Sequence, residues 1–253
     1  MSADAIAQAS WSAIERIERL RGNPVLVLFA TTIDRDILPD LHEACMSIGR
    51  TDRLDVVLIT RGGVVNDARR VALMLRSVAG HLAFIVPHHC ESSGTLLALA
   101  ADEIVAGDLA IFSPIDPHLD GAVGGEASSL SWLDVTSFSE MADAWFSIDR
   151  RQAGVELLRL LCASVSAHAL TMFYRASKEM HDTALELMAH PLRRASSTQR
   201  ERIVSELMGG YRSHNYAITA QQLAGLGLNV ARDTHVEEAA WALAMCLREH
   251  LAS

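Results

Sequence analysis

The first half of the chain alternates short apolar runs with longer amphipathic segments, and this alternation restricts the folds it can adopt. Residues 25–30, 54–59 and 82–86 are apolar runs with the length and composition of buried strands. Helical patterns over residues 37–48 and 64–78 lie between them. Strands connected through helices need crossover connections, so the pattern predicts an α/β fold with a mainly parallel sheet.

The second half of the chain is mainly helical in pattern. Apolar residues recur at helical spacing over residues 155–165, and a long helical segment over residues 167–189 ends before Pro191. We expect these helices to project from the sheet; the alternative is that they cover one of its faces. Residues 117–130 are rich in Gly, Ala and Ser, which predicts a loop.

The composition fits one compact domain. Of the 253 residues, 50% are hydrophobic and 21% are charged, which is enough for one large core. We therefore expect a single domain over residues 1–253. It would consist of an N-terminal helix (1–22), an α/β core (24–130) and a helical C-terminal region (150–253).

Charge and cysteine content narrow the partners and the compartment. The net charge of −9 argues against a nucleic-acid partner, because such a surface needs clustered Lys and Arg. The four cysteines lie far apart without C-x-x-C spacing, which predicts buried, reduced thiols: Cys45, Cys90, Cys162 and Cys246. The N-terminus has no basic region of the signal-peptide type, and no apolar run approaches the roughly 20 residues of a membrane span. We therefore expect a cytoplasmic protein without a membrane span.

Ser92 is the strongest candidate for a nucleophile. It stands in the turn 91–95, between an apolar run that ends at Pro87 and a helical pattern that starts at Leu96. A helix N-terminus offers free N–H groups and a favourable dipole to a negative oxygen, so a serine there has an oxyanion site close by. The alternative is that Ser92 only caps the helix, which is a common use of serine.

A glycine pair marks a second turn, about thirty residues upstream. Gly62 and Gly63 follow the apolar run 54–60 and precede the helical pattern that starts at Val64. Glycines let the backbone approach a ligand closely, and their N–H groups are candidates for polarising a carbonyl. The alternative is an ordinary turn between a strand and a helix.

Four motifs follow one another along the chain. They are residues 59–63 (ITRGG), 86–105 (VPHHCESSGTLLALAADEIV), 113–118 (SPIDPH) and 213–219 (SHNYAIT). Together they resemble the serine dehydrogenase proteinase family of the Clp protease and crotonase superfamily, which is related to signal peptide peptidase A. The resemblance covers roughly residues 24–230. It implies a spiral of strand-strand-helix repeats, with residues 24–130 as the catalytic core and residues 150–253 as the region of oligomerisation.

The same resemblance implies a catalytic triad. Ser92 would attack the substrate, His214 would move the proton, and Asp116 would hold the imidazole. The rival base is His118, which follows Ser92 by about the interval found in Clp proteases. We favour His214 because it falls on the histidine of the family motif.

The resemblance also selects an oxyanion hole. The N–H groups of Gly63 and Ser93 would hold the oxyanion, and Gly62 would shape the turn. His88 and His89 stand near the serine but show no ligand spacing that indicates a metal. We therefore expect no metal and no cofactor.

Three residues depart from the family pattern. Arg61 replaces a proline, Glu91 stands where methionine is usual, and Asn215 replaces an aspartate that often follows the histidine. The charge of Glu91 would disfavour an oxyanion if it points inward, or would select basic substrates. Asn215 would impair catalysis if the family aspartate is the third member of the triad.

The favoured function is an ATP-independent serine endopeptidase that hydrolyses peptides or unfolded proteins through an acyl-enzyme on Ser92, as a homo-oligomer. Two other classes stay open, because fold alone does not set function. One is a weakly active or inactive oligomeric scaffold or partner-dependent subunit. The other is a crotonase-like acyl-thioester enzyme, which shares the two-glycine oxyanion hole and needs no serine nucleophile.

Overall fold

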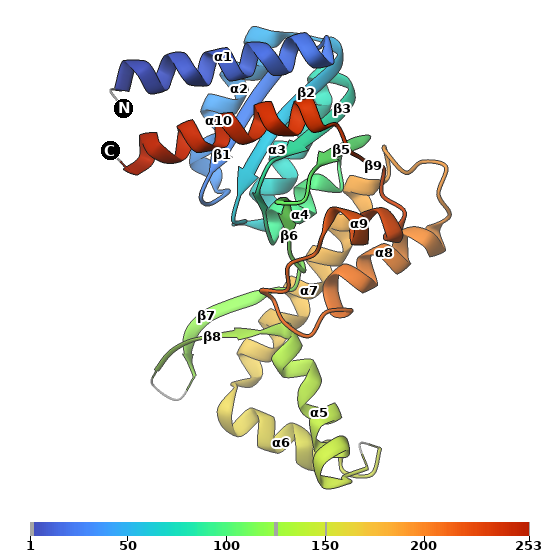
Figure 1. The fold of residues 1–253 in the computed structure, drawn as a ribbon. Coiled ribbons are helices and arrows are strands. Elements are labelled where there is room, and N and C mark those ends of the chain that lie inside the picture. Colours follow the sequence, from blue (N-terminus) through green and yellow to red (C-terminus); the bar gives the residue numbers. More distant parts are fainter. Residues whose placement is uncertain (1–2, 124–125, 150, 253) are drawn as a thin grey trace.

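The computed structural model describes residues 3–123, 126–149 and 151–252. Within these residues a seven-stranded sheet forms the centre of the molecule (Figure 1). Its strands are β1 (Val25–Ala30), β2 (Thr51–Thr60), β3 (Ala79–Val86), β4 (His89–Cys90), β5 (Glu103–Ala106), β6 (Ile111–Phe112) and β9 (Val230–Ala231). Neighbouring strands in this sheet pair in parallel. The predicted α/β fold with a mainly parallel sheet is confirmed.

Strand β2 is the branch point of the sheet. It pairs with β1 on one side and with β3 on the other. At Thr60, its last residue, the neighbour becomes Cys90 of β4. Strand β6 pairs with β4 in turn, and an antiparallel bridge joins Phe112 of β6 to Ile218. The sheet therefore curls at the point where the Ser92 turn follows β4.

Helices cover both faces of the sheet (Figure 1). Helices α1 (Ala3–Arg21) and α10 (Thr234–Ala252) lie side by side over one face, where they pack on inward-pointing residues of β2, β3 and β5. The alternate strand residues form a second core on the opposite face, because successive side chains of a strand point to opposite sides. The helices that contribute to this second core are α2 (Leu38–Ile48), α3 (Val65–Val78), α4 (Ser93–Ala98), α7 (Ala167–Met188), α8 (Ser197–Gly209) and α9 (Ala220–Leu226).

Buried ion pairs join α1 to the sheet. Arg21, the last residue of α1, donates to Asp55 of β2 at 2.9 Å and to Glu103 of β5 at 2.5 Å. Asp55 is only 1% exposed and also accepts from Asn23 at 2.8 Å. A buried carboxylate is stable only with such donors, so these contacts fix the end of α1 against two strands.

The segment between β6 and α8 forms an arm that projects from the sheet (Figure 1). It contains β7 (His118–Val123), β8 (Glu126–Ser131), α5 (Trp132–Phe146), α6 (Gly154–Ser164) and the first part of α7. Large apolar side chains are exposed along it: Trp145, Phe146, Val155, Leu158, Leu160, Met172 and Tyr174. The helices of the second half thus project from the sheet in part, as expected, while the last turns of α7 and one face of α8 pack against the core.

The loop expected over residues 117–130 is a hairpin in its described part. Strands β7 and β8 pair antiparallel, from His118 opposite Ser131 to Val123 opposite Glu126. Residues 124 and 125 lie outside the described residues. The prediction was wrong because Gly, Ala and Ser give almost no hydrophobic alternation from which a strand can be recognised.

The cysteines are all free, as predicted, but they are not all buried. Cys45 and Cys90 are buried, and burial raises the pKa of both thiols. Cys246 is half-buried, while Cys162 is exposed on α6. The sequence placed Cys162 in an apolar helix, and the exposure follows from the projection of that helix away from the core.

Within the described ranges, no single helix is both long and apolar enough to cross a membrane. One pair, α6 with α7, reaches that length and composition when taken together, but the two helices are bent by 101° at the break between them.

Candidate active site

Ser92 occupies a strained turn between β4 and α4. Its φ of +52° and ψ of −119° are rarely adopted by residues other than glycine. Three neighbours hold this conformation: the Ser92 N–H donates to Ser113 Oγ at 2.7 Å, the Ser92 carbonyl accepts from Leu96 at 3.0 Å, and the Gly94 N–H donates to Glu91 at 2.8 Å. The Ser92 side chain makes no capping hydrogen bond. The turn therefore presents the hydroxyl without using it to cap the helix.

The glycine pair lies directly against this turn. Gly62 and Gly63 have φ values of +110° and +145°, which favour glycine. A Cβ on Gly62 would lie 2.7 Å from the Cβ of Ser92, and a Cβ on Gly63 would lie 2.2 Å from the carbonyl oxygen of Ile33. Neither position therefore has room for a side chain.

The candidate oxyanion donors are both free within the described part of the chain. The N–H of Ile33 donates to the carbonyl of Gly62, and the N–H of Val64 donates to the carbonyl of Ile33. The N–H of Gly63, between them, has no acceptor among the described residues. The N–H of Ser93 also has no acceptor, as expected for the first residue of a helix. Free N–H groups on either side of Ser92 are what an oxyanion site requires.

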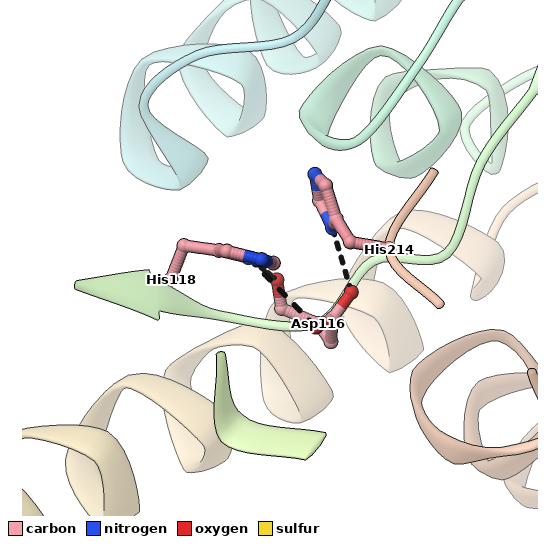
Figure 2. A group of neighbouring side chains, drawn as sticks. All are labelled: Asp116, His118 and His214. Carbon is pink, nitrogen blue, oxygen red and sulfur yellow. Dashed lines mark hydrogen bonds and ion pairs between the residues drawn. The ribbon is translucent and has the colours of Figure 1, made fainter. Parts of the chain in front are cut away.

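Asp116 and His214 form a hydrogen-bonded pair. The Nδ1 of His214 lies 2.7 Å from Oδ1 of Asp116, a residue that is 2% exposed (Figure 2). The bridge between Phe112 and Ile218 explains the meeting, since their backbones exchange hydrogen bonds of 3.1 and 2.8 Å. Asp116 lies four residues after one partner of the bridge and His214 four residues before the other. Antiparallel pairing brings such residues together.

His118 is part of the same cluster. Its Nδ1 lies 3.1 Å from the backbone oxygen of Asp116 and 3.8 Å from Oδ2 of the carboxylate. The rings of His118 and His214 are 3.8 Å apart, centre to centre. Figure 2 shows both rings beside Asp116, with the outer nitrogen of His214 pointing away from it. Of the two rings, that of His214 holds the closer contact with the carboxylate.

Ser113 connects the serine turn with the aspartate, and the sequence analysis did not identify it. Its Oγ accepts from the N–H of Ser92, and its N–H donates to Oγ1 of Thr95 at 3.0 Å. Asp116 follows it by three residues. The structure thus places Ser92 and the Asp116–His214 pair on linked segments, but no hydrogen bond joins Ser92 to either histidine within the described residues. The only signal in the sequence was the position of Ser113 in the SPIDPH motif.

Glu91 contacts a neighbouring histidine and a neighbouring arginine. Its carboxylate contacts Nδ1 of His89 and lies 3.5 Å from Arg61, whose guanidinium also lies 3.2 Å from Nε2 of His89. Two of the three departures from the family pattern therefore compensate each other. The pKa of the adjacent His88 is lowered, by burial first and then by the positive charges of His89 and Arg61.

Asn215 is exposed and does not take part in the pair, since Asp116 already supplies the carboxylate to His214. The backbone N–H of Asn215 donates to Ser213 at 3.2 Å. The aspartate that is missing at this position is therefore not needed to hold the imidazole.

A cavity of about 260 Å³ opens beside the glycine turn. It lies at the carboxyl ends of β1 and β2, against α10, which is where ligands bind in open parallel sheets. Its walls are formed by Phe29, Ala30, Thr31, Ile59, Thr60, Arg61, His88, His89, Ala244, Met245 and Arg248. The lining combines apolar side chains with Arg61, Arg248 and two histidines, and it does not include Ser92, Asp116 or His214.

Comparison with known families identifies the core of the chain. The family model described as ClpP-like SDH-type serine proteinase matches residues 15–140. These residues belong to that family. The family resemblance inferred from the sequence is confirmed. The match to the SDH-type family includes Ser92, Asp116 and the glycine pair, whereas His214 lies outside it.

Two relatives of this chain come from one organism, Methanocaldococcus jannaschii. The uncharacterized protein MJ1495 of Methanocaldococcus jannaschii is 26% identical over 230 residues, which cover 86% of this chain and 70% of that protein. MJ0137 of the same organism, also uncharacterized, is 27% identical over 190 residues. This match covers 75% of the chain but only 57% of MJ0137.

A solved structure shares the fold. A mutant of the 1510-N membrane-bound stomatin-specific protease superimposes with a TM-score of 0.50 at 13% identity, over 84% of this chain and 81% of that one. At this level of identity the likeness concerns the fold alone. The predicted Clp protease-like architecture is confirmed.

Proposed function

We propose that the chain is a serine endopeptidase that acts without ATP and forms an acyl-enzyme on Ser92. The observation that carries the proposal is the strained backbone of Ser92, held against the glycine pair at the start of α4. Backbone strain of this kind persists only where the surrounding structure enforces it, and it concentrates at functional sites. Membership of residues 15–140 in a serine proteinase family supports the same chemistry.

In the proposed reaction, Ser92 Oγ attacks the substrate carbonyl while Nε2 of His214 takes the hydroxyl proton. Asp116 keeps the proton of His214 on Nδ1, so that Nε2 is free to accept. The N–H groups of Gly63 and Ser93 hold the oxyanion of the tetrahedral intermediate. Collapse expels the amine, which receives the proton from His214. A water molecule then attacks the acyl-enzyme while His214 takes its proton. His214 returns this proton to Ser92 Oγ as the acid product leaves.

The base must reach the serine on substrate binding. In a free enzyme, catalytic hydrogen bonds are often long and tighten in the complex. The side chain of His214 is 29% exposed, so it is open to solvent and to a substrate. His118 remains the second candidate base, because its ring lies in the same cluster.

We propose that substrates are peptides or unfolded segments with apolar side chains, bound in the cavity beside Arg61. The exposed apolar side chains of the arm support a homo-oligomer. The cytoplasmic location predicted from the sequence stays a proposal, which fractionation of cells that express the full chain will test.

Labelling with a fluorophosphonate, read by intact mass and peptide mapping, tests the mechanism. We expect one adduct per chain on Ser92, no adduct in Ser92→Ala, and slow labelling in His214→Ala. Ser147→Ala is a matched control, because Ser147 is the other residue besides glycine with positive φ in the described ranges and lies at the end of α5. If Ser92 is labelled more slowly in His118→Ala than in His214→Ala, His118 is the base.

Two results would favour the other classes. A folded oligomer that is not labelled, and that cleaves no unfolded protein, would indicate a scaffold or a partner-dependent subunit. Binding of a coenzyme A ester by an unlabelled protein would indicate an acyl-thioester enzyme. Hydrolysis that survives in Ser92→Ala would overturn the proposed mechanism outright.

A further inference from the structure

The cluster of Asp116, His118 and His214 brings together three groups of the types that bind zinc. A carboxylate and two imidazoles form common three-ligand sets for Zn²⁺, which then keeps an open fourth position. One donor atom from each residue lies within 4.8 Å of the others. The set was not visible in the sequence, because it depends on the bridge between Phe112 and Ile218.

The carboxylate of Asp116 has an unused oxygen. Oδ1 contacts His214, but Oδ2 is buried and has no hydrogen-bond partner within the described part of the chain. The nearest donor nitrogen known to face it, Nδ1 of His118, lies 3.8 Å away, which is too long for a hydrogen bond. A buried anionic oxygen without a donor is unfavourable, so this atom is available to a cation.

The two rings present nitrogen atoms to this carboxylate. Figure 2 shows Nδ1 of both His118 and His214 on the side of Asp116. The side chains of the two histidines are 26% and 29% exposed, whereas that of Asp116 is not exposed at all. The two histidines are therefore accessible to an ion from solvent, and the buried carboxylate of Asp116 lies behind them.

We propose that this cluster binds one Zn²⁺ ion through Asp116, His118 and His214, and that the ion inhibits the enzyme. The proposal of inhibition rests on the proposed function, whereas the binding site does not. Ligand atoms about 2.1 Å from a tetrahedral zinc lie roughly 3.4 Å apart. The donor atoms that lie farthest apart, at up to 4.8 Å, need to close by about 1.4 Å, which rotation of the partly exposed rings can supply.

Inhibition follows from the tautomer of His214. A neutral imidazole that binds a metal through Nδ1 carries its proton on Nε2. The nitrogen that should accept the proton of Ser92 is then already protonated. The ion also takes the place of the proton on Nδ1, so the hydrogen bond through which Asp116 Oδ1 orients the ring is lost. One ion thus removes both the acceptor and its support without any contact to the serine.

The binding site is tested by titration of metal-free protein with Zn²⁺ against a chromophoric chelator. We carry out the titration in Ser92→Ala as well as in the wild type, so that the result does not depend on catalysis. We expect one ion per chain in both. His118→Gln should weaken binding by more than about 100-fold, since loss of even an outer partner of a ligand costs 10–100-fold. His88→Gln, outside the cluster, should bind as the wild type does.

A second readout guards against variants that fail to fold. Co²⁺ in place of Zn²⁺ should give the visible absorption of a four- or five-coordinate site in the wild type, and His214→Asn should lose it while far-ultraviolet dichroism stays unchanged. The proposed site would be overturned if the wild type binds no zinc. It would also be overturned if His118→Gln binds zinc as tightly as the wild type does.

The inhibition is tested by fluorophosphonate labelling of Ser92 with and without Zn²⁺. We expect saturating zinc to slow labelling by at least tenfold and a chelator to restore it. A labelling rate that is unchanged when zinc is bound would overturn the inhibitory role. Labelling without any zinc binding would leave the proposed function standing and remove the metal site. Zinc binding without labelling, even under chelator, would uphold the site and remove the proposed function together with the inhibition.

Discussion

The backbone of Gly62 packs against the side chain of Ser92. A Cβ on Gly62 would lie 2.7 Å from Cβ and 3.3 Å from Oγ of Ser92, and 2.9 Å from the carbonyl oxygen of Glu91. Both residues have positive φ. The position of the candidate nucleophile is therefore set by a turn from another part of the chain as well as by its own strained backbone.

Gly62→Ala should slow the labelling of Ser92 by about 100-fold, because a displacement of a reacting group by 1 Å can have an effect of that size. The substitution should also lower the free energy of unfolding by about 1–3 kcal/mol through backbone strain. Labelling rate and urea denaturation measure the two effects. Gly225→Ala is the control, since a Cβ at that helical glycine meets nothing within 4 Å. An unchanged labelling rate in Gly62→Ala would contradict the close packing.

Asp116→Asn should lower the rate of labelling and of peptide hydrolysis by up to about 10⁴-fold, because an amide holds the wrong tautomer of the imidazole. The fold should survive, since the substitution conserves shape. Asn215→Asp is an informative partner. It should have little effect alone, because His214 already has a carboxylate at 2.7 Å. Recovery of activity in the double variant Asp116→Asn with Asn215→Asp would show that a carboxylate at position 215 can hold the imidazole in place of Asp116.

The fold was largely predictable because strands in a parallel sheet are buried on both faces and therefore form continuous apolar runs. The run over β2 is an example: its last seven residues are buried. The hairpin of β7 and β8 was not predictable, because residues such as Ser128 and Ala127 carry no alternation of polarity. Strand pairing between small residues is visible only in three dimensions.

The candidate site was only partly predictable for a similar reason. Residue types and motifs selected Ser92, Asp116 and His214, but a sequence pattern does not bring residues 98 positions apart into contact. The bridge between Phe112 and Ile218 does so. The same bridge assembles the cluster with His118, which the sequence presented only as a rival base.

The stability of the protein should depend on Asp102 in acid. Burial by itself raises the pKa of this carboxyl, but hydrogen bonds from Arg76 and from the N–H of Leu82 outweigh it and hold the pKa below its ordinary value of 3.8. A depressed pKa in the folded state adds stability that is fully present above the unfolded value and is lost as the pH falls through the folded one. The contribution should therefore be fully present at pH 7 and decrease as the pH falls below 3.8.

Asp102→Asn should lower the free energy of unfolding at pH 7 by about 2 kcal/mol, the usual range for hydrogen bonds to a charged group. The difference between the variant and the wild type should shrink as the pH falls below 3.8. Urea denaturation at pH 7 and over a series of lower pH values measures the difference. Asp108→Asn is the control, because the pair of Asp108 with Arg232 is exposed and should contribute little. A difference that does not decrease anywhere below pH 3.8 would exclude the ionised carboxylate as its origin.

The projecting arm should hold the oligomer together. Trp145 on α5 is 76% exposed and Leu160 on α6 is 62% exposed, and side chains of this size are seldom left in water over a wide surface. We expect the wild type to sediment as an oligomer and the double variant Trp145→Glu with Leu160→Glu to sediment as a monomer. The two glutamates would be buried in the subunit contact without partners for their charges. Met46→Glu, similarly exposed on α2 of the core, should leave the oligomer intact. If the wild type sediments as a monomer at all concentrations, the protein has no such subunit contact. If the double variant remains an oligomer, the subunit contact lies elsewhere.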